Sequence, residues 1–352
     1  MELIEYKKLI RALKMRDTTK YETWDNIMQL CLNMYNDNHD FLPHCLKLAK
    51  AVKLSAQRLL IQNRDVRFED LYWQALKFEA PHLFDSYLLY LERKRIERDR
   101  FYSPKRKQLN KLGLIQALQD MEDDKTDILS ISMPPGTQKT TLEKFFASWV
   151  IGRHPDDFSL FFSHSGDITR MFYDGVLDIT TNSDEYCWSE IFPEVKFHST
   201  NAKKETINFN KYKPFSNMQC TSVGSKNAGK VRANRYLYCD DLIGGIEEAL
   251  NKNILDKLWR IYGTDAKQRK MDGCKEIHIA TRWSVHDVIG RLKDIYEGND
   301  RAKFIAVPDI DPVTGESNFD YKYNGFSVEF FHDQEKTMDE ITYRCLYKNE
   351  PI

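Results

Sequence analysis

The fold of this chain is decided by the segment DILSISMPPGTQKTT, residues 127–141. Its first seven residues are mostly apolar, which predicts a buried strand. Two prolines and a glycine follow at 134–136, which predicts a tight turn. The next residues, KTTLEKFFASWVIG, predict a helix that begins at Lys139. A strand, a turn and a helix in this order direct backbone N–H groups and a helix N-terminus toward one point, which is a suitable site for phosphate oxygens.

The residues of this turn predict ATP and Mg²⁺ as ligands. Lys139 is expected to bridge the β- and γ-phosphates, and the hydroxyl of Thr140 is expected to bind Mg²⁺. The common motif G-x-x-x-x-G-K-[ST] has glycine before the lysine, where this chain has Gln138. The alternative is an ordinary strand–turn–helix with a surface lysine. The predicted nucleotide-binding segment comprises Pro135, Gly136, Thr137, Gln138, Lys139, Thr140 and Thr141.

A second strand, RYLYCDDL at 235–242, ends in two acids. Its apolar residues predict that Asp240 lies at the carboxyl edge of the sheet, where open α/β folds bind ligands. Asp240 is expected to hold Mg²⁺ through water, and Asp241 to orient the attacking water. Because two adjacent aspartates repel each other, the pKa of one of them is expected to be raised. Glu247 or Glu248 could supply the base instead, and an exposed turn with two acids is the structural alternative.

A third strand is predicted in EIHIATRWSVHDVIGRL, residues 276–292. Its polar end, Thr281-Arg282, is expected beside the acidic strand, where the Thr281 hydroxyl could sense the γ-phosphate. His286 and Asp287 resemble a metal-binding pair, but two ligands at a helix start rarely suffice. A capping or hydrogen-bonding role is the better interpretation of this pair.

The pattern of the whole chain predicts an α/β protein with a helical N-terminal region at 1–98. After residue 100, short apolar runs alternate with longer amphipathic segments, which favours a mainly parallel sheet flanked by crossover helices. We expect a core domain at 99–310 and a C-terminal segment at 311–352. The predicted strands are 127–133, 158–164, 206–209, 218–223, 236–239, 276–281 and 303–307.

Composition sets broad limits on the kind of protein. The chain has 352 residues, is 41% hydrophobic and 30% charged, and has a net charge of −1. It has no apolar stretch of the roughly 18 residues that a membrane span needs, and no signal-peptide core. Seven cysteines without a C-x-x-C motif predict buried reduced thiols. The net charge does not demand a polyanionic partner, so DNA would have to contact local cations. The candidates are Lys203, Lys204, Lys211, Lys213, Lys226 and Lys230.

These pieces together resemble the large terminase subunit of tailed bacteriophages. The resemblance covers residues 101–352 and rests on FYSPKRKQL, ISMPPGTQKTT, YLYCDDL and IATRWSVHDVIGRL, which occur in the family's order. It implies a P-loop fold of the ASCE/RecA-like type and an ATPase that translocates double-stranded DNA into procapsids. It further implies that Arg106 and Gln108 contact adenine and that Thr281 couples hydrolysis to movement.

The resemblance also implies partners and a place of action. The family works as a homo-oligomeric ring, generally a pentamer, with the portal protein and the small terminase subunit. It acts in the host cell cytoplasm and transiently at the portal vertex of the procapsid. The family often has an arginine where this chain has Gly136, so a trans-acting arginine finger is expected. Arg232 is the first candidate and Lys230 the second.

The end of the chain resembles the segments that lead into the family's nuclease domain. These segments are VPDIDP, NGFSVEFF and ITYRCLYKNEPI, and no later acidic cluster follows them. We therefore expect a motor domain without nuclease activity. Two other functions remain open at this point. A helicase or remodelling ATPase would share the phosphate turn and the acid pair, and a non-catalytic P-loop assembly protein would fit the replacement at Gln138.

Overall fold

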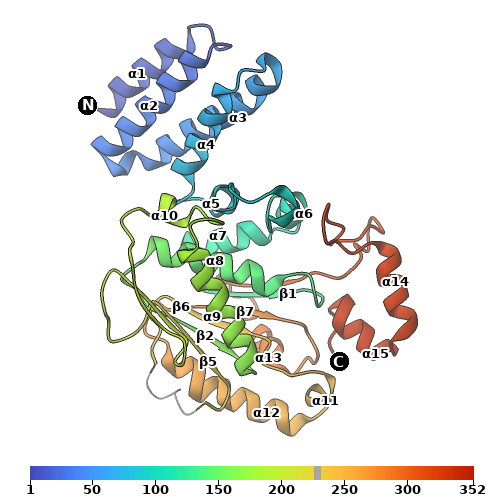
Figure 1. Cartoon of the computed structure of the whole chain (residues 1–352). Coiled ribbons are helices and arrows are strands. Elements are labelled where there is room, and N and C mark those ends of the chain that lie inside the picture. Colours follow the sequence, from blue (N-terminus) through green and yellow to red (C-terminus); the bar gives the residue numbers. More distant parts are fainter. Residues whose placement is uncertain (226–230) are drawn as a thin grey trace. The chain divides into compact units, whose positions relative to one another are not determined.

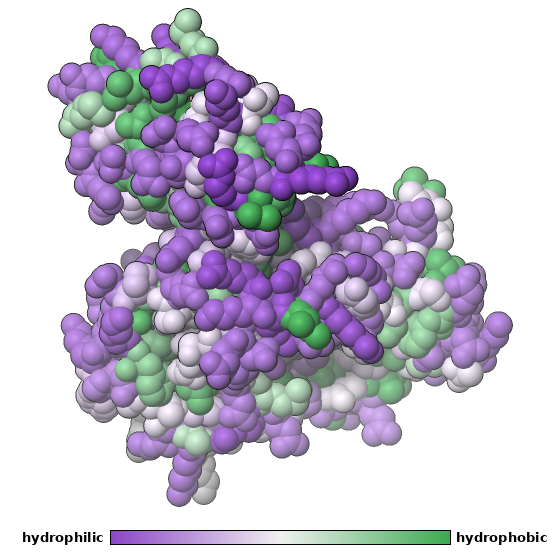
Figure 2. Space-filling model, turned by 45° about the horizontal axis from the view of Figure 1, so that its top comes forward, coloured by the Kyte–Doolittle hydropathy of each residue, from purple (hydrophilic) through white to green (hydrophobic). Residues whose placement is uncertain are grey.

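The computed structural model describes residues 1–225 and 231–352. The chain divides into two compact units, Met1–Arg93 and Lys94–Ile352 (Figure 1). In the space-filling view, hydrophilic side chains cover most of the visible surface, and hydrophobic ones form small separate groups (Figure 2). Among the described residues, no helix combines the length and apolar character that crossing a bilayer requires. All seven cysteines are unpaired and buried, which confirms that part of the prediction.

The first unit is entirely helical, as predicted. Residues with apolar side chains recur at helical spacing and meet in two adjoining cores. The larger core contains Trp24, Ile27 and Phe68, and the smaller contains Tyr6 and Cys31. The helices are α1 (Leu3–Lys14), α2 (Tyr21–Asp37), α3 (Leu42–Asn63), α4 (Arg67–Glu79) and α5 (Phe84–Leu91), with a short 3₁₀ turn η1 (His39–Phe41) between α2 and α3.

The second unit is built on one eight-stranded sheet with the order β3-β4-β5-β2-β6-β7-β1-β8. The six strands from β5 to β8 in this order run parallel, whereas β3–β4 and β4–β5 are antiparallel. This confirms the predicted mainly parallel α/β fold. The strands are β1 (Ile128–Ser132), β2 (Ser159–Ser163), β3 (Phe197–Asn201), β4 (Thr206–Phe209), β5 (Met218–Ser222), β6 (Tyr236–Asp240), β7 (Lys275–Ala280) and β8 (Ala302–Ala306). Every strand except β3 was predicted from its apolar run.

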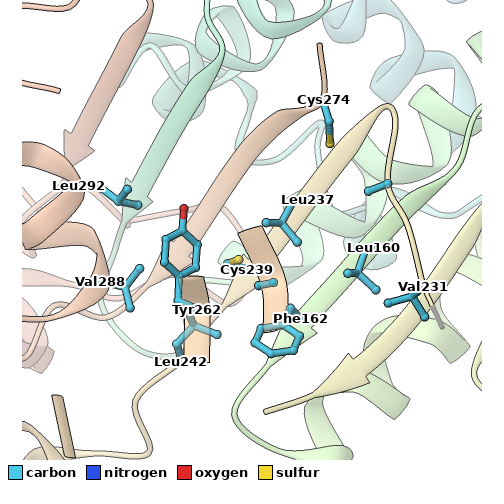
Figure 3. Packing of buried hydrophobic residues seen from close by; sticks show 12 residues of the cluster. Leu160, Phe162, Val231, Leu237, Cys239, Leu242, Tyr262, Cys274, Val288 and Leu292 are labelled. Carbon is cyan, nitrogen blue, oxygen red and sulfur yellow. The ribbon is translucent and has the colours of Figure 1, made fainter. Parts of the chain in front are cut away.

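Helices cover both faces of the sheet. On one face, Phe146 of α8 packs against Tyr236, and Phe172 of α9 stacks on Phe161. The opposite face carries a core in which Cys239 of β6 meets Leu292 of α13 (Figure 3). The helices are α6 (Arg106–Lys111), α7 (Leu114–Glu122), α8 (Lys139–Arg153), α9 (Gly166–Thr181), α10 (Trp188–Ile191), α11 (Ile246–Ala249), α12 (Lys252–Ile261), α13 (Val288–Ile295), α14 (Val328–Thr337) and α15 (Glu340–Tyr343), with the short turns η2 (Glu97–Asp99), η4 (Tyr262–Ala266), η5 (Lys267–Arg269) and η6 (Arg344–Lys348).

The C-terminal segment after β8 folds back onto the same unit. The Val285 N–H donates to the carbonyl of Ile352 at 2.7 Å, and the side chain of Asn349 donates to the carbonyl of Val307. In the middle of the segment, the Asp320 carbonyl accepts a hydrogen bond from Gln108 Nε2 at 2.9 Å. This last bond places the loop before α14 beside α6.

Candidate nucleotide-binding site

The predicted phosphate turn lies between β1 and α8, and Lys139 is the first residue of that helix. Two of its residues have the left-handed backbone conformation, Gly136 with φ 78° and Gln138 with φ 67°. A Cβ atom at Gly136 would lie 3.2 Å from the ring of Phe326, so glycine also allows the close approach of the C-terminal segment. A non-glycine residue in this conformation costs about 1 kcal/mol or more. Gln138 thus has a backbone conformation that glycine would reach without this cost.

The side chain of Lys139 is buried between two strand ends. Its Nζ atom donates to Thr281 Oγ1 at 3.0 Å and lies 3.7 Å from Asp241 Oδ2. This is possible because β7 lies between β1 and β6 in the sheet, so that Thr281 follows the strand next to the phosphate turn. Only 8% of the Lys139 surface is exposed, so its ammonium acts in an environment that is poorly screened by water.

Asp240 meets the second residue of α8. Thr140 Oγ1 donates to Asp240 Oδ2 at 2.6 Å, and the other carboxylate oxygen, Oδ1, is buried without a hydrogen-bond partner among the described residues. Burial and the neighbouring charge of Asp241 raise the pKa of Asp240 to about 7, although the bond from Thr140 opposes this. The predicted repulsion between the two aspartates is therefore confirmed in direction.

These two side chains fit a magnesium ion. Mg²⁺ prefers oxygen ligands and usually keeps several waters while it contacts one or two carboxylates and substrate phosphates. Thr140 and Asp240 offer a hydroxyl and a carboxylate at one point, and the unpartnered Oδ1 atom has no competing bond. Among the described residues, no group of three or more His, Cys, Asp and Glu side chains could hold a metal. A site made of Thr140, Asp240 and substrate oxygens is consistent with this.

Asp241 is held in a fixed and strained position. Its φ of 39° lies in the left-handed region, and such strain in a non-glycine residue tends to occur at functional sites. Its backbone N–H donates to the carbonyl of Ile279 at 2.9 Å, and its Oδ1 atom accepts from the N–H of Thr281 at 2.9 Å. Its remaining oxygen faces Lys139. By contrast, Glu248 accepts a bond from the N–H of Gly244, so it caps its own loop.

The two residues expected at adenine have different surroundings. Gln108 lines a hollow of about 580 Å³ next to the loop at 315–320. Arg106 begins α6 and is not among the residues that line this hollow. Gln108 already donates to Asp320, so an adenine ring would have to compete with that bond or use the carboxamide oxygen.

Arg232 does not reach the site of its own chain. It precedes β6 at the amino end of the strand, whereas Asp240 lies at the carboxyl end. Its side chain is exposed, and Nη1 donates to the carbonyl of Gln268 at 2.8 Å. Any catalytic role for Arg232 would therefore require a neighbouring subunit. The second candidate, Lys230, lies outside the described residues.

The candidate DNA cations differ in exposure. Lys203 and Lys204 lie exposed in the turn between β3 and β4, and Lys211 is also exposed. Lys213 was wrongly included in this set. Only 7% of it is exposed, and its ammonium donates to the carbonyl of Pro155 and to Asn217 Oδ1. It is a structural cation of the loop before β5. Lys226 and Lys230 lie outside the described residues.

The pair at the start of α13 has the predicted capping role. Asp287 Oδ1 accepts a bond from the N–H of Gly290 at 2.6 Å, and Oδ2 pairs with Arg282 Nε at 2.8 Å. Asp287 thus joins the N-terminus of α13 to the buried Arg282 that follows Thr281. His286 contributes a backbone N–H to Ser284 rather than a ligand.

Sequence reasoning missed two side chains of this site. Glu143 is fully buried, and neither carboxyl oxygen has a partner among the described residues. Burial and the charges of Asp240 and Asp241 raise its pKa well above the ordinary value. It follows Lys139 by four residues and therefore lies on the same helical face, which the spacing could have revealed. The second is His164, directly after β2, whose ring Nδ1 contacts the Asp241 carbonyl.

The raised pKa of Glu143 predicts that the stability of the folded protein depends on pH in an unusual way. Its pKa in the folded protein lies above that in the unfolded chain, so the folded protein retains a proton that the unfolded chain releases. The free energy of unfolding must therefore fall as pH rises between these two values, by about 1.4 kcal/mol per unit of separation. We expect Glu143→Gln to raise the melting temperature, and more at pH 8 than at pH 5.

Calorimetry of the full chain at the two pH values measures this effect. Glu297→Gln is the matched control, because Glu297 is exposed on the surface of the same unit. Equal changes in melting temperature at both pH values for Glu143→Gln would contradict an uncharged, buried Glu143.

The chain was compared with known proteins and structures. No known family model matches it, and no curated protein matches its sequence. Among solved structures, it resembles a mutant ATPase domain of the large terminase of Thermus phage P74-26, with 8% identity and a TM-score of 0.43, over 67% of this chain and 93% of that one. It also resembles the large terminase of bacteriophage HK97, with 12% identity and a TM-score of 0.46, over 75% of this chain and 54% of that one.

The match to the HK97 protein thus spans about half of that chain. These likenesses concern the fold. What the chain itself provides is a mainly parallel sheet with a lysine, a hydroxyl and two aspartates gathered at the ends of three adjacent strands. Its structure is similar to those of phage large terminases.

Proposed function

We propose that this chain is the ATP-hydrolysing motor domain of a viral large terminase, which translocates double-stranded DNA into procapsids. The observation that carries the proposal is the meeting of Lys139, Thr140, Asp240 and Asp241. The Thr140–Asp240 bond of 2.6 Å and the Lys139–Asp241 separation of 3.7 Å join the phosphate turn to the acidic strand end. A turn without a nucleotide function has no need to bury a lysine against two adjacent carboxylates.

The proposed reaction is transfer of the γ-phosphoryl group of ATP to water. Lys139 neutralises charge on the β- and γ-phosphates, and Asp241 accepts a hydrogen bond from the attacking water and orients it. Thr140 and Asp240 would hold Mg²⁺, which would supply positive charge at the phosphate oxygens. Binding of the triphosphate would draw Lys139 away from Thr281 and Asp241, because the phosphates offer it a stronger partner.

This exchange of partners suggests how hydrolysis could be coupled to movement. Thr281 bonds to Lys139 through its hydroxyl and to Asp241 through its backbone N–H. Arg282, the next residue, is tied through Asp287 to the start of α13. A change at Lys139 would therefore reach α13 through Thr281, Arg282 and Asp287.

The proposal includes the partners of such a motor. DNA is contacted mainly through its phosphates, because packaging must tolerate every sequence. Lys203, Lys204 and Lys211 are exposed and available for such contacts. Subunits assemble as a ring, pentameric in the proposed arrangement, with the portal protein and the small terminase subunit in the host cytoplasm and at the portal vertex. Arg232 of one subunit then acts at the site of its neighbour.

The experiment is ATP turnover by the full chain in the presence of Mg²⁺ and duplex DNA, at concentrations that allow assembly. Two inactive variants, Arg232→Ala and Asp241→Ala, are then mixed. Because a mixed ring contains interfaces with an intact arginine and an intact aspartate from different subunits, we expect turnover to return in the mixture. If the wild type hydrolyses ATP but the mixture of the two variants does not, the trans role of Arg232 is contradicted. If the wild type does not bind ATP, the motor function itself is contradicted.

A further inference from the structure

The N-terminal unit contains a groove with an unusual distribution of charge. It has a volume of about 280 Å³ and lies between α1 and α3, with α2 packed against both helices. The residues that line it are Leu3, Lys7, Ile10, Arg11, Lys14, Met34, His44, Lys47 and Leu48. Five of these are basic and four are apolar, and the lining includes no acid and no uncharged polar side chain. The nearly balanced charge of the unit as a whole does not explain this composition.

The basic residues form two rows with the apolar ones between them. Lys7, Arg11 and Lys14 follow one another at intervals of four and three residues, which puts them on one face of α1. His44 and Lys47 are three residues apart on α3 and form the second row. Because α1 has 12 residues, the longer row runs along a helix of about 18 Å.

These cations have no partners within the described parts of the chain. None of the five forms an ion pair or a side-chain hydrogen bond there, whereas Arg67 in the same unit pairs with two acids. The nearby acids are engaged elsewhere. Glu5 accepts a bond from the N–H of Glu2 in the capping box of α1, and Asp37 binds the N-terminal amine and the Tyr6 hydroxyl. The row of positive charge is therefore not neutralised by the protein itself.

The combination of a basic rim and an apolar floor favours one kind of ligand. Met34 and Ile10 close the floor, while Leu3 and Leu48 remain partly accessible beside it. A surface that binds DNA phosphates uses hydroxyl, amide and backbone donors along with its cations, and no hydroxyl or amide side chain lines this groove. An amphipathic helix with acidic flanks matches both components, because its apolar side chains enter the groove and its carboxylates meet the rim. We propose that this groove binds an acidic amphipathic helix of a partner protein.

A synthetic peptide tests this directly with the full chain. The probe is a labelled helical peptide of about four turns, with leucine at helical spacing and glutamate elsewhere. We expect it to bind, and we expect Lys7→Glu/Arg11→Glu to weaken binding at least about tenfold, because charge complementarity turns into repulsion. Lys8→Glu/Arg16→Glu is the matched control, since these two neighbouring cations are outside the lining and should leave the affinity unchanged.

Two further probes separate the apolar contribution from charge. A peptide of the same composition in scrambled order should bind at least about tenfold more weakly, because it cannot present one apolar face. Equal binding of the ordered and scrambled peptides, or of wild type and the Lys7→Glu/Arg11→Glu variant, would overturn the proposal. So would a DNA duplex that binds more tightly than the peptide and loses affinity in the same variant. Circular dichroism establishes that each variant remains folded. ATP turnover is not needed for any of these measurements, so their outcome is separate from that of the proposed function.

Discussion

Lys139→Ala is expected to lower ATP turnover at least about 100-fold. An effect of this size is typical when a group that stabilises the negative charge of the transition state is removed. The ammonium of Lys139 is buried and donates a hydrogen bond to Thr281. It also lies within 4 Å of the Asp241 carboxylate. Its loss removes positive charge from the phosphates and from the side of the Asp241 carboxylate. We therefore expect weaker nucleotide binding as well as slower turnover.

The measurement combines steady-state ATP hydrolysis with binding of a fluorescent ATP analogue. Lys257→Ala is the control, because Lys257 is an exposed lysine on α12 whose loss should change neither quantity. Melting temperatures of both variants distinguish a damaged site from a damaged fold. If Lys139→Ala hydrolyses ATP as fast as the control, the phosphate turn is not a nucleotide site.

The strands of the sheet could be predicted because most are buried on both faces. Runs such as Ile128–Ser132 and Tyr236–Asp240 are fully buried and consist largely of apolar residues, which gives a strong local signal. The missed strand, Phe197–Asn201, is the exposed edge strand of a hairpin and carries mostly polar residues, whereas its partner β4 is buried. Its pairing with β4 depends on the hairpin partner rather than on its own composition.

The local parts of the site could also be predicted, but their meeting depends on the sheet order. Lys139 and Thr281 are 142 residues apart in sequence and are brought together because β7 lies between β1 and β6. The contact of Gly136 with Phe326 has no sequence signal at all, since it arises when the C-terminal segment folds back. The sequence predicted Lys213 to be a surface cation, but its ammonium donates a hydrogen bond to the carbonyl of Pro155.

Asp241→Asn is expected to lower kcat by about 100-fold or more while KM changes little, because general-base and water-orienting groups contribute on this scale. Asparagine retains an oxygen that can accept from the Thr281 N–H, so the local backbone should be preserved. It lacks the negative charge that opposes Lys139 and that would attract a proton from water. A loss confined to kcat therefore isolates the chemical role of this carboxylate from its structural one.

Two variants decide between Asp241 and the other acids near it. Glu248→Gln should keep nearly full turnover, because Glu248 accepts a bond from the Gly244 N–H and glutamine can replace it there. Glu247→Gln should behave in the same way, because Glu247 is an exposed residue of the short helix α11. If either loses turnover while Asp241→Asn retains it, the base has been assigned to the wrong carboxylate. The strained backbone of Asp241 would then serve only to join β6 to β7, since the same backbone N–H and side-chain oxygen bond to Ile279 and Thr281.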